Sequence, residues 1–199
     1  MRDPESAARI HVADGLSGLE VGELRESRCI ADVGAGAGFP GLVLAIALPH
    51  ARVDLIEASG RKAAVAERLA RSAEVSNARC VVTRAEEWAA RPQAAGGGAG
   101  RYDAASARAV APLAVLAEYG APLLRLGGVL VAWKGGRDER EEQAVAAAAE
   151  QLGLELDPPR RVEPFEGAER HHLYVLRKVL PTPVGFPRRP GMARKRPLG

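Results

Sequence analysis

A glycine-dense turn beside an acid is the part of this chain whose residue types and spacing could do chemistry. Gly34, Gly36 and Gly38 alternate in the stretch IADVGAGAGFPG at 30–41, and Asp32 lies two residues before the first of them. Glycine lets a backbone take sharp turns and approach a ligand at distances that a Cβ would block. The spacing therefore predicts a turn that brings the backbone close to a nucleotide-like cofactor.

The glycine spacing alone leaves two classes of cofactor open. Gly36, Gly38 and Gly41 also satisfy the GxGxxG pattern of dinucleotide-binding turns. Asp32 favours the other class, because a carboxylate at a strand end suits the ammonium and sulfonium cations of S-adenosylmethionine (SAM) and would repel a diphosphate. The pattern acid-x-G-x-G-x-G resembles motif I of class I SAM-dependent methyltransferases. Glu57, which ends the next predicted strand, is expected to accept hydrogen bonds from the ribose hydroxyls.

These residues must be positioned by strands that alternate with helices. Hydrophobic periodicity predicts strands at 29–33, 52–57, 78–83, 102–107 and 128–133, helices at 39–48, 60–75, 111–124 and 138–152, and a closing pair of strands at 155–163 and 170–179. Asp3 as an N-cap with Pro4 behind it predicts a first helix near the N-terminus. The expected fold class is α/β, a Rossmann-like class I SAM-dependent methyltransferase with a seven-stranded, mostly parallel sheet and a C-terminal antiparallel hairpin.

Length and composition fit a single cytoplasmic domain, expected to be a monomer. The 199 residues are 47% hydrophobic and 27% charged, which is enough apolar surface for a core. No apolar run approaches the ~18 residues of a spanning helix, and the start MRDPES lacks the order of a signal peptide. Cys29 and Cys80 fall in predicted core strands and are expected to be reduced thiols. The histidines show no metal-ligand spacing, so no metal site is predicted; they are His11, His50, His171 and His172.

The positive charge of the chain is concentrated at its C-terminal end. The net charge is +3, yet eight of the 28 Lys and Arg residues and none of the 25 acids follow Glu169, so residues 1–169 carry a net charge of −5. Five prolines within 181–199 are expected to keep that segment out of helix and sheet. We therefore predict a methyltransferase domain at 1–180 and an extended basic tail at 181–199 suited to RNA phosphates. A solvated tail without a partner is the alternative.

Several separate segments together resemble one family, the RsmG type, also called glucose-inhibited division protein B. They are DVGAGAGFPG at 32–41, RAEEWA at 84–89, ARAVAPLAVLAEYGAPLL at 107–124, WKG at 133–135, ERHHLYVLRK at 169–178 and FPRRPGMARKRPL at 186–198. That family uses SAM to methylate N7 of one guanine in the 530 loop of 16S ribosomal RNA. The resemblance implies the same cofactor and the small ribosomal subunit as partner. Family members usually carry a helical segment ahead of the region that this chain's start matches, so the resemblance also implies a truncated N-terminal segment.

The resemblance carries functional residues onto matching positions. It implies SAM contacts at Gly34, Phe39, Ala85, Glu86 and Arg108, to which the class pattern adds Asp32, Gly36, Gly38 and Glu57. The cations expected to hold RNA phosphates are Lys134, Arg188, Arg189, Arg194, Lys195 and Arg196. For Lys134, a solvated charge at a strand end is the alternative interpretation.

The residues after the fourth strand are compatible with guanine N7 as the target. The chain reads SARA there, without the acid or Asn, two prolines and aromatic that related enzymes use on exocyclic amines. Neither thiol lies at the carboxyl edge, as pyrimidine C5 methylation would require. Guanine N7 carries an in-plane lone pair at neutral pH and needs no base, so catalysis is expected to consist mostly of positioning. Arg108 is the predicted catalytic residue, orienting either the SAM carboxylate or guanine O6.

Two other functions remain open from the sequence. A nicotinamide-dependent oxidoreductase would use the GxGxxG spacing with Glu57 on the ribose, but no proton-transfer residue such as a Tyr-Lys pair is found. A non-catalytic ribosome assembly factor would keep the fold and the basic tail without transferring a methyl group.

Overall fold

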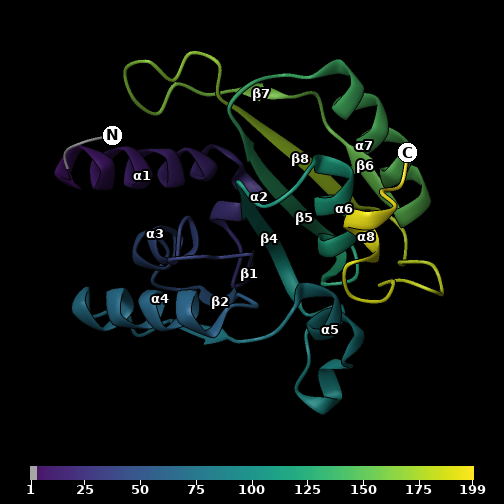
Figure 1. Cartoon of the computed structure of the whole chain (residues 1–199), viewed down its shortest axis with the longest axis horizontal. Coiled ribbons are helices and arrows are strands. Elements are labelled where there is room, and N and C mark those ends of the chain that lie inside the picture. Colours follow the sequence, from purple (N-terminus) through teal and green to yellow (C-terminus); the bar gives the residue numbers. More distant parts are fainter. Residues whose placement is uncertain (1–3) are drawn as a thin grey trace.

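A twisted sheet with helices on both faces forms the molecule (Figure 1). The computed structural model describes residues 4–199. The strand order is β3-β2-β1-β4-β5-β8-β6, and β7 also pairs with β8. The strands are β1 Cys29–Val33, β2 Arg52–Ile56, β3 Ala78–Val81, β4 Tyr102–Arg108, β5 Leu124–Lys134, β6 Leu154–Leu156, β7 Arg160–Arg161 and β8 His172–Lys178. The first five pair in parallel and β8 is antiparallel to β5, which confirms the fold class.

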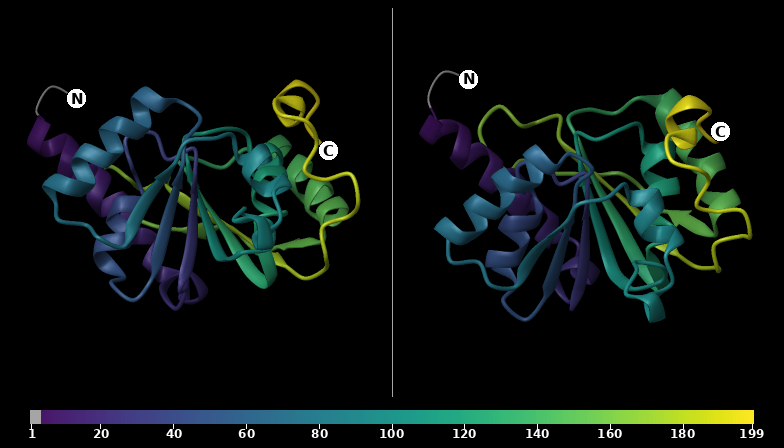
Figure 2. Two further views of the ribbon diagram at one scale, coloured as in Figure 1. Left: turned by 90° about the horizontal axis from the view of Figure 1, so that it is seen from below. Right: turned by 60° about the horizontal axis from the view of Figure 1, so that its bottom comes forward.

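The helices form one layer on each side of the sheet, as Figure 2 shows. α1, α3 and α4 lie on one side, and α5, α6, α7 and α8 lie on the other (Figure 1). Their bounds are α1 Pro4–Ser17, α2 Gly22–Arg25, α3 Gly41–Ala47, α4 Gly60–Ser72, α5 Ala85–Ala90, α6 Leu113–Gly120, α7 Glu139–Leu152 and α8 Met192–Lys195, with short 3-10 turns at Gly18–Glu20 and Gln93–Ala95. The predicted Asp3 N-cap of the first helix lies outside the described residues. None of the described helices is long and apolar enough to cross a membrane.

The side chains of the central strands point alternately to the two faces of the sheet, so the core has two parts, one under each helix layer. Ile30 of β1 packs in a cluster with Leu44 of α3 and Val53 of β2. Its neighbour Ala31 belongs to the opposite cluster, which includes Leu116 of α6. Successive side chains of a strand point to opposite faces, so a strand covered on both faces is apolar throughout. Apart from Asp32, which is buried, the run predicted at 29–33 is such a strand.

The closing hairpin has one interrupted strand. In place of a single strand at 155–163, β6 and β7 each pair antiparallel with β8, and Pro158 and Pro159 lie between them. Proline has no N–H to donate to a sheet ladder. The sheet therefore has eight strands rather than the predicted seven, although the hairpin itself is confirmed.

Two predicted boundaries are wrong around α6. The helix predicted at 111–124 spans only Leu113–Gly120, since Pro112 precedes it and Pro122 follows it. The strand predicted at 128–133 begins earlier, because β5 starts at Leu124 and pairs there with Tyr102. A register shift between Tyr102 and Ala104 accommodates the added residues.

The C-terminal segment folds back onto the α6 side of the domain. Ala193 of α8 is buried, and Phe186 and Leu198 pack against the same core cluster. Arg188 Nε donates to Glu118 Oε1 at 2.7 Å, and the Glu118 side chain is almost wholly buried. The prediction of an extended segment without helix is therefore wrong, because specific contacts hold residues 186–198 on the domain.

Candidate active site

The glycine-rich turn joins β1 to α3 at the carboxyl edge of the sheet. The backbone N–H groups of Gly34 and Ala35 both donate to Ile56 O, at 2.8 and 3.1 Å, which fixes the turn against the end of β2. Gly34 has a φ of +68°, and a Cβ at this position would lie 2.7 Å from Val110 Cγ2. Only glycine therefore fits between β1 and the loop after β4.

Glu57 ties the loop after β2 to this turn. Its Oε2 accepts a hydrogen bond from Gly36 N at 2.9 Å, and its Oε1 accepts one from Ser59 N at 2.7 Å. Each carboxylate oxygen can accept more than one hydrogen bond, so acceptor capacity remains for a ligand. The buried carboxylate thus holds the turn and also lies at the edge where open α/β sheets bind ligands.

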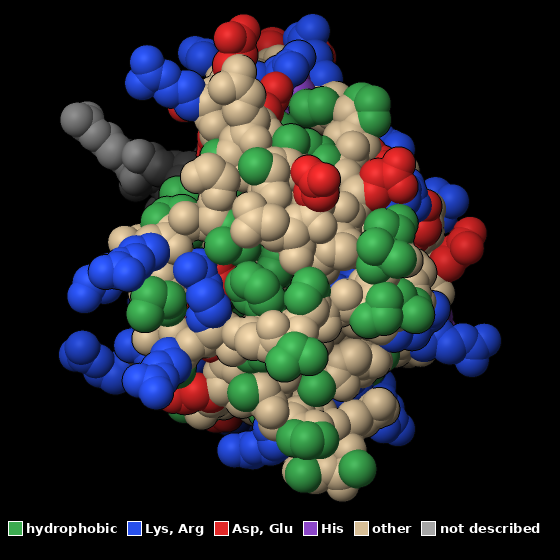
Figure 3. Space-filling model, turned by 90° about the vertical axis from the view of Figure 1, so that its right-hand side faces the viewer, with side chains coloured by type: hydrophobic (Ala, Val, Ile, Leu, Met, Phe, Trp, Pro, Cys, Tyr) green, Lys and Arg blue, Asp and Glu red, His purple; other side chains and the backbone are tan. Residues whose placement is uncertain are grey.

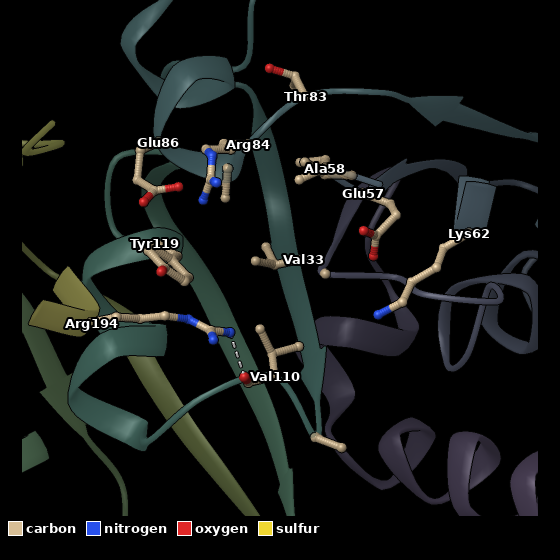
Figure 4. A pocket seen from close by; sticks show the side chains of 14 residues that line it. Val33, Glu57, Ala58, Lys62, Thr83, Arg84, Glu86, Val110, Tyr119 and Arg194 are labelled. Atoms are coloured by element: carbon tan, nitrogen blue, oxygen red, sulfur yellow. Dashed lines mark hydrogen bonds between the residues drawn. The ribbon is translucent and has the colours of Figure 1, made fainter. Parts of the chain in front are cut away.

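A pocket of about 340 Å³, which we call the Glu57 pocket, opens at this edge. Its lining includes four of the predicted cofactor residues, namely Gly34, Glu57, Ala85 and Glu86. Figure 4 shows Glu57 on one wall, with Glu86, Tyr119 and Arg194 on the opposite wall. The volume lies at the lower end of the range for small-molecule sites.

A second pocket of about 400 Å³, the Arg108 pocket, adjoins the first. Ala109 lines both pockets and has a φ of +54°, a conformation that non-glycine residues rarely adopt. Arg108 and Lys134, at the ends of β4 and β5, also line the second pocket. Two ligands, one bound in each pocket, would therefore lie next to each other at the loop that follows β4.

A network from three distant segments holds the Arg108 guanidinium. Arg108 Nη1 donates to Asp14 Oδ2 at 2.8 Å, and Nη2 donates to His11 Nδ1 at 3.2 Å. Asp14 Oδ1 lies 3.2 Å from His171 Nδ1. Arg108 Cζ also lies 5.9 Å from the ring centroid of Phe39, within cation–π range. Phe39 therefore contacts Arg108 and does not line the Glu57 pocket.

Sequence reasoning missed His11, Asp14 and His171, which all line the Arg108 pocket. Among the described residues, no group of three or more His, Cys, Asp or Glu side chains could hold a metal. A usable signal was the spacing of His11 and Asp14, because residues three apart share a helix face. Asp14 is buried, and Trp133 Nε1 donates to its carbonyl at 2.8 Å, which fixes α1 against β5.

The structure gives Asp32 and Gly38 supporting positions. Asp32 does not line the Glu57 pocket; it is buried behind the turn, where Oδ2 accepts from Gly41 N at 2.9 Å and Oδ1 from Ser106 Oγ at 2.8 Å. Burial in a low-dielectric site raises the pKa of Asp32 to about 6. Gly38 has a φ of +104°, and a Cβ there would lie 2.5 Å from Leu42 Cδ1. Both residues shape the turn from behind.

We expect Asp32→Asn to change how stability depends on pH. The folded-state pKa of about 6 lies above the ordinary value of 3.8, so the folded protein holds this proton more tightly than the unfolded chain. The stability from Asp32 is therefore full below pH 3.8 and is lost as the pH rises to about 6. The loss is on the order of 3 kcal/mol. Urea unfolding at several pH values should show the Asn variant gaining relative to wild type across this range; parallel pH curves would contradict the assignment.

The predicted RNA-binding cations fall into three groups. Lys134 Nζ donates to Glu141 Oε1 at 2.7 Å and lines the Arg108 pocket. Arg188 is paired with Glu118, and Arg194 lines the Glu57 pocket. The remaining three, Arg189, Lys195 and Arg196, are exposed and line neither pocket. Figure 3 shows Lys and Arg side chains projecting around the rim of the face that carries α6, α7 and α8.

Comparisons with known proteins identify the fold and the family. The solved structure of the antibiotic-resistance methyltransferase Kmr is 21% identical and has a TM-score of 0.57, covering 82% of this chain and 93% of its own. The fold is thus that of the class I SAM-dependent methyltransferases. A family model described as rRNA small subunit methyltransferase G matches residues 1–171.

Two curated relatives carry the same description. The ribosomal RNA small subunit methyltransferase G of Rubrobacter xylanophilus is 45% identical, over 99% of this chain and 75% of its own length. That of Synechococcus sp. (strain JA-3-3Ab) is 38% identical, over 99% of this chain and 76% of its own. The chain belongs to the rRNA small subunit methyltransferase G family, which confirms the resemblance drawn from its motifs.

Proposed function

We propose that the protein transfers a methyl group from SAM to N7 of a guanine in the 530 loop of 16S ribosomal RNA, acting as a monomer in the cytoplasm. The observation that carries this proposal is the adjacency of the Glu57 and Arg108 pockets at Ala109. A cofactor in the first pocket and a base in the second would face each other at the edge where β1 and β4 end. Family membership supports ribosomal RNA as the substrate.

The residues of the Glu57 pocket fit SAM. The Glu57 carboxylate can accept hydrogen bonds from ribose hydroxyls while it holds Gly36 N. Ala58 and Ala85, after β2 and at the start of α5, offer small apolar walls for an adenine ring. When bound, SAM supplies a methyl group on a sulfonium; as the new N–C bond forms, the electron pair of the broken C–S bond goes to sulfur.

The residues of the Arg108 pocket fit a guanine. Leu116 and the rings of Trp133 and Phe165 provide apolar walls. Arg108 and Lys134 can donate to O6, and no residue is needed to remove a proton from N7. Each cation is paired with a carboxylate, Arg108 with Asp14 and Lys134 with Glu141.

This pairing matters because methylation makes the guanine cationic. An unpaired Arg108 or Lys134 would repel the positive charge that arrives on the base. With Asp14 and Glu141 beside them, the two cations can orient O6 without that cost. The exposed cations Arg189, Lys195 and Arg196 are proposed to hold RNA phosphates outside the pocket.

The test is methyl transfer to small ribosomal subunits that lack the modification. We expect label from methyl-tritiated SAM in 16S ribosomal RNA, and base-labile strand cleavage at one guanine of the 530 loop. Calorimetry with NAD should show no binding, since the nicotinamide alternative is not supported by family membership. Binding of SAM without label in RNA would favour the non-catalytic assembly factor, and label without base-labile cleavage would overturn N7 as the target.

A further inference from the structure

The C-terminal segment forms one wall of the Glu57 pocket. Gly191 N donates to Glu86 Oε1 at 2.8 Å, and Arg194 Nη2 donates to Val110 O at 2.7 Å. Glu86, Val110 and Arg194 all line the pocket. The sequence predicted that Arg194 would contact RNA phosphates, but its guanidinium is held beside the site that we assign to SAM.

The segment is anchored on both sides of α8, so its position in the wall does not depend on Arg194 alone. Before the helix, Arg188 pairs with the buried Glu118, and its Nη2 also donates to Arg196 O at 2.9 Å. Within the helix, Ala193 is 1% exposed. Arg194 is exposed, and its guanidinium meets the pocket at Val110 O. Removing its side chain should therefore leave the fold of the segment unchanged.

The position of Arg194 indicates which part of a cofactor it would meet. Glu57 lies on one wall of the pocket, and Arg194 lies with Tyr119 and Glu86 on the opposite wall (Figure 4). With the ribose at Glu57, the base would extend past Ala58 and Ala85, which line the pocket between Glu57 and Glu86. Arg194, linked to that wall through the Gly191–Glu86 hydrogen bond, then lies beside the base.

We propose that Arg194 is a cofactor-binding residue that covers the adenine base of SAM, and that residues 191–194 are part of the cofactor site. This rests on the proposed assignment of the Glu57 pocket to SAM. A planar guanidinium can lie over an aromatic face and be attracted by its π electrons. The hydrogen bond from Arg194 to Val110 O holds the guanidinium in place for that contact.

The test is calorimetric titration of the full chain with two ligands, S-adenosylhomocysteine and adenosine. We expect Arg194→Ala to weaken both by about tenfold, and by the same factor, because both ligands carry the adenine. Arg194→Lys keeps the charge without the planar group and should weaken both by about threefold. Lys195→Ala is the matched control: it removes the neighbouring cation, which does not line the pocket, and should leave both affinities unchanged.

The outcomes separate this inference from the proposed function. Equal affinities for wild type and Arg194→Ala would overturn the role of Arg194 and leave the cofactor assignment intact. Weaker binding of S-adenosylhomocysteine alone would place Arg194 at the amino-acid end and overturn the adenine contact. Failure of the wild-type protein to bind S-adenosylhomocysteine would overturn both. Urea unfolding of each variant checks that the fold is retained.

Discussion

Replacing Arg108 by alanine should slow methyl transfer by about two to three orders of magnitude while leaving the affinity for SAM within about threefold of wild type. Arg108 lines the Arg108 pocket and not the Glu57 pocket, so its side chain faces the proposed guanine. The family resemblance implies a cofactor contact for this residue. The arrangement of the pockets favours the other part of the prediction, orientation of guanine O6.

The size of this effect follows from how tightly Arg108 is held. Asp14, His11 and Phe39 surround the guanidinium, so the donor is already positioned before the base arrives. Preorganised donors contribute more than mobile ones because they need no ordering during the reaction. Asp14→Asn should give a smaller loss of rate, since its single carbonyl oxygen can accept from Arg108 or from His171 but not from both.

Single-turnover rates at saturating subunits, with SAM affinity from calorimetry, measure this prediction. Asp103→Asn is the matched control, because Asp103 also bridges an arginine, Arg125, and backbone N–H groups, but at the opposite end of β4. The control should keep the wild-type rate. A normal rate for Arg108→Ala, or a loss that saturating SAM restores, would contradict the proposed role.

The glycine-rich turn could be predicted from sequence because its determinants are local. The strand, the glycines and the helix start all fall within 29–47, and the turn needs no distant residue to be recognised. Glu57 could also be predicted, since parallel strands end at the same edge of a sheet. The proximity of Gly36 and Glu57, which form a hydrogen bond, is therefore predictable although the two residues are far apart in the sequence.

The sequence predicted Arg108 and Lys134 but not the other polar residues of the Arg108 pocket, His11, Asp14 and His171, because these meet Arg108 only through tertiary packing. Asp14 contacts residues 94 and 157 positions away, Arg108 and His171. No local pattern links these segments. Helix α1 has to pack on Trp133 before Asp14 can reach either partner.

The C-terminal segment shows how composition can mislead. Its positive charge predicts an extended segment whose cations all contact RNA phosphates. In the structure, Arg188 pairs with Glu118 and Arg194 lines the Glu57 pocket. One signal was present in the sequence: Glu118 is the only acid in the apolar stretch 113–124 and is buried in α6. A buried carboxylate requires a partner, and Arg188 supplies it. The place where this ion pair anchors the segment decides which other cation reaches a pocket, and the sequence does not indicate that place.

Glu57→Gln should have the opposite signature to Arg108→Ala, weakening SAM by about 100-fold while the rate at saturating SAM stays near wild type. The carboxylate holds Gly36 N and Ser59 N and is proposed to accept from the ribose. An amide offers one acceptor oxygen, so it can accept from only one of these two backbone N–H groups. Its NH₂ group would face the other N–H, and two donors cannot form a hydrogen bond with each other. The variant therefore loses ribose contacts and loosens the turn together.

Calorimetry with SAM measures the loss, and Glu87→Gln provides the control. Glu87 is a nearby acid whose Oε2 accepts from Thr83 Oγ1 and caps α5 by accepting from Arg84 N. It does not line the pocket, so its variant should bind SAM normally. Wild-type affinity in Glu57→Gln would contradict the cofactor assignment. Glu57→Gln is expected to weaken cofactor binding, whereas Arg108→Ala is expected to slow methyl transfer. The two variants together therefore test whether one pocket holds the cofactor and the adjoining pocket holds the base.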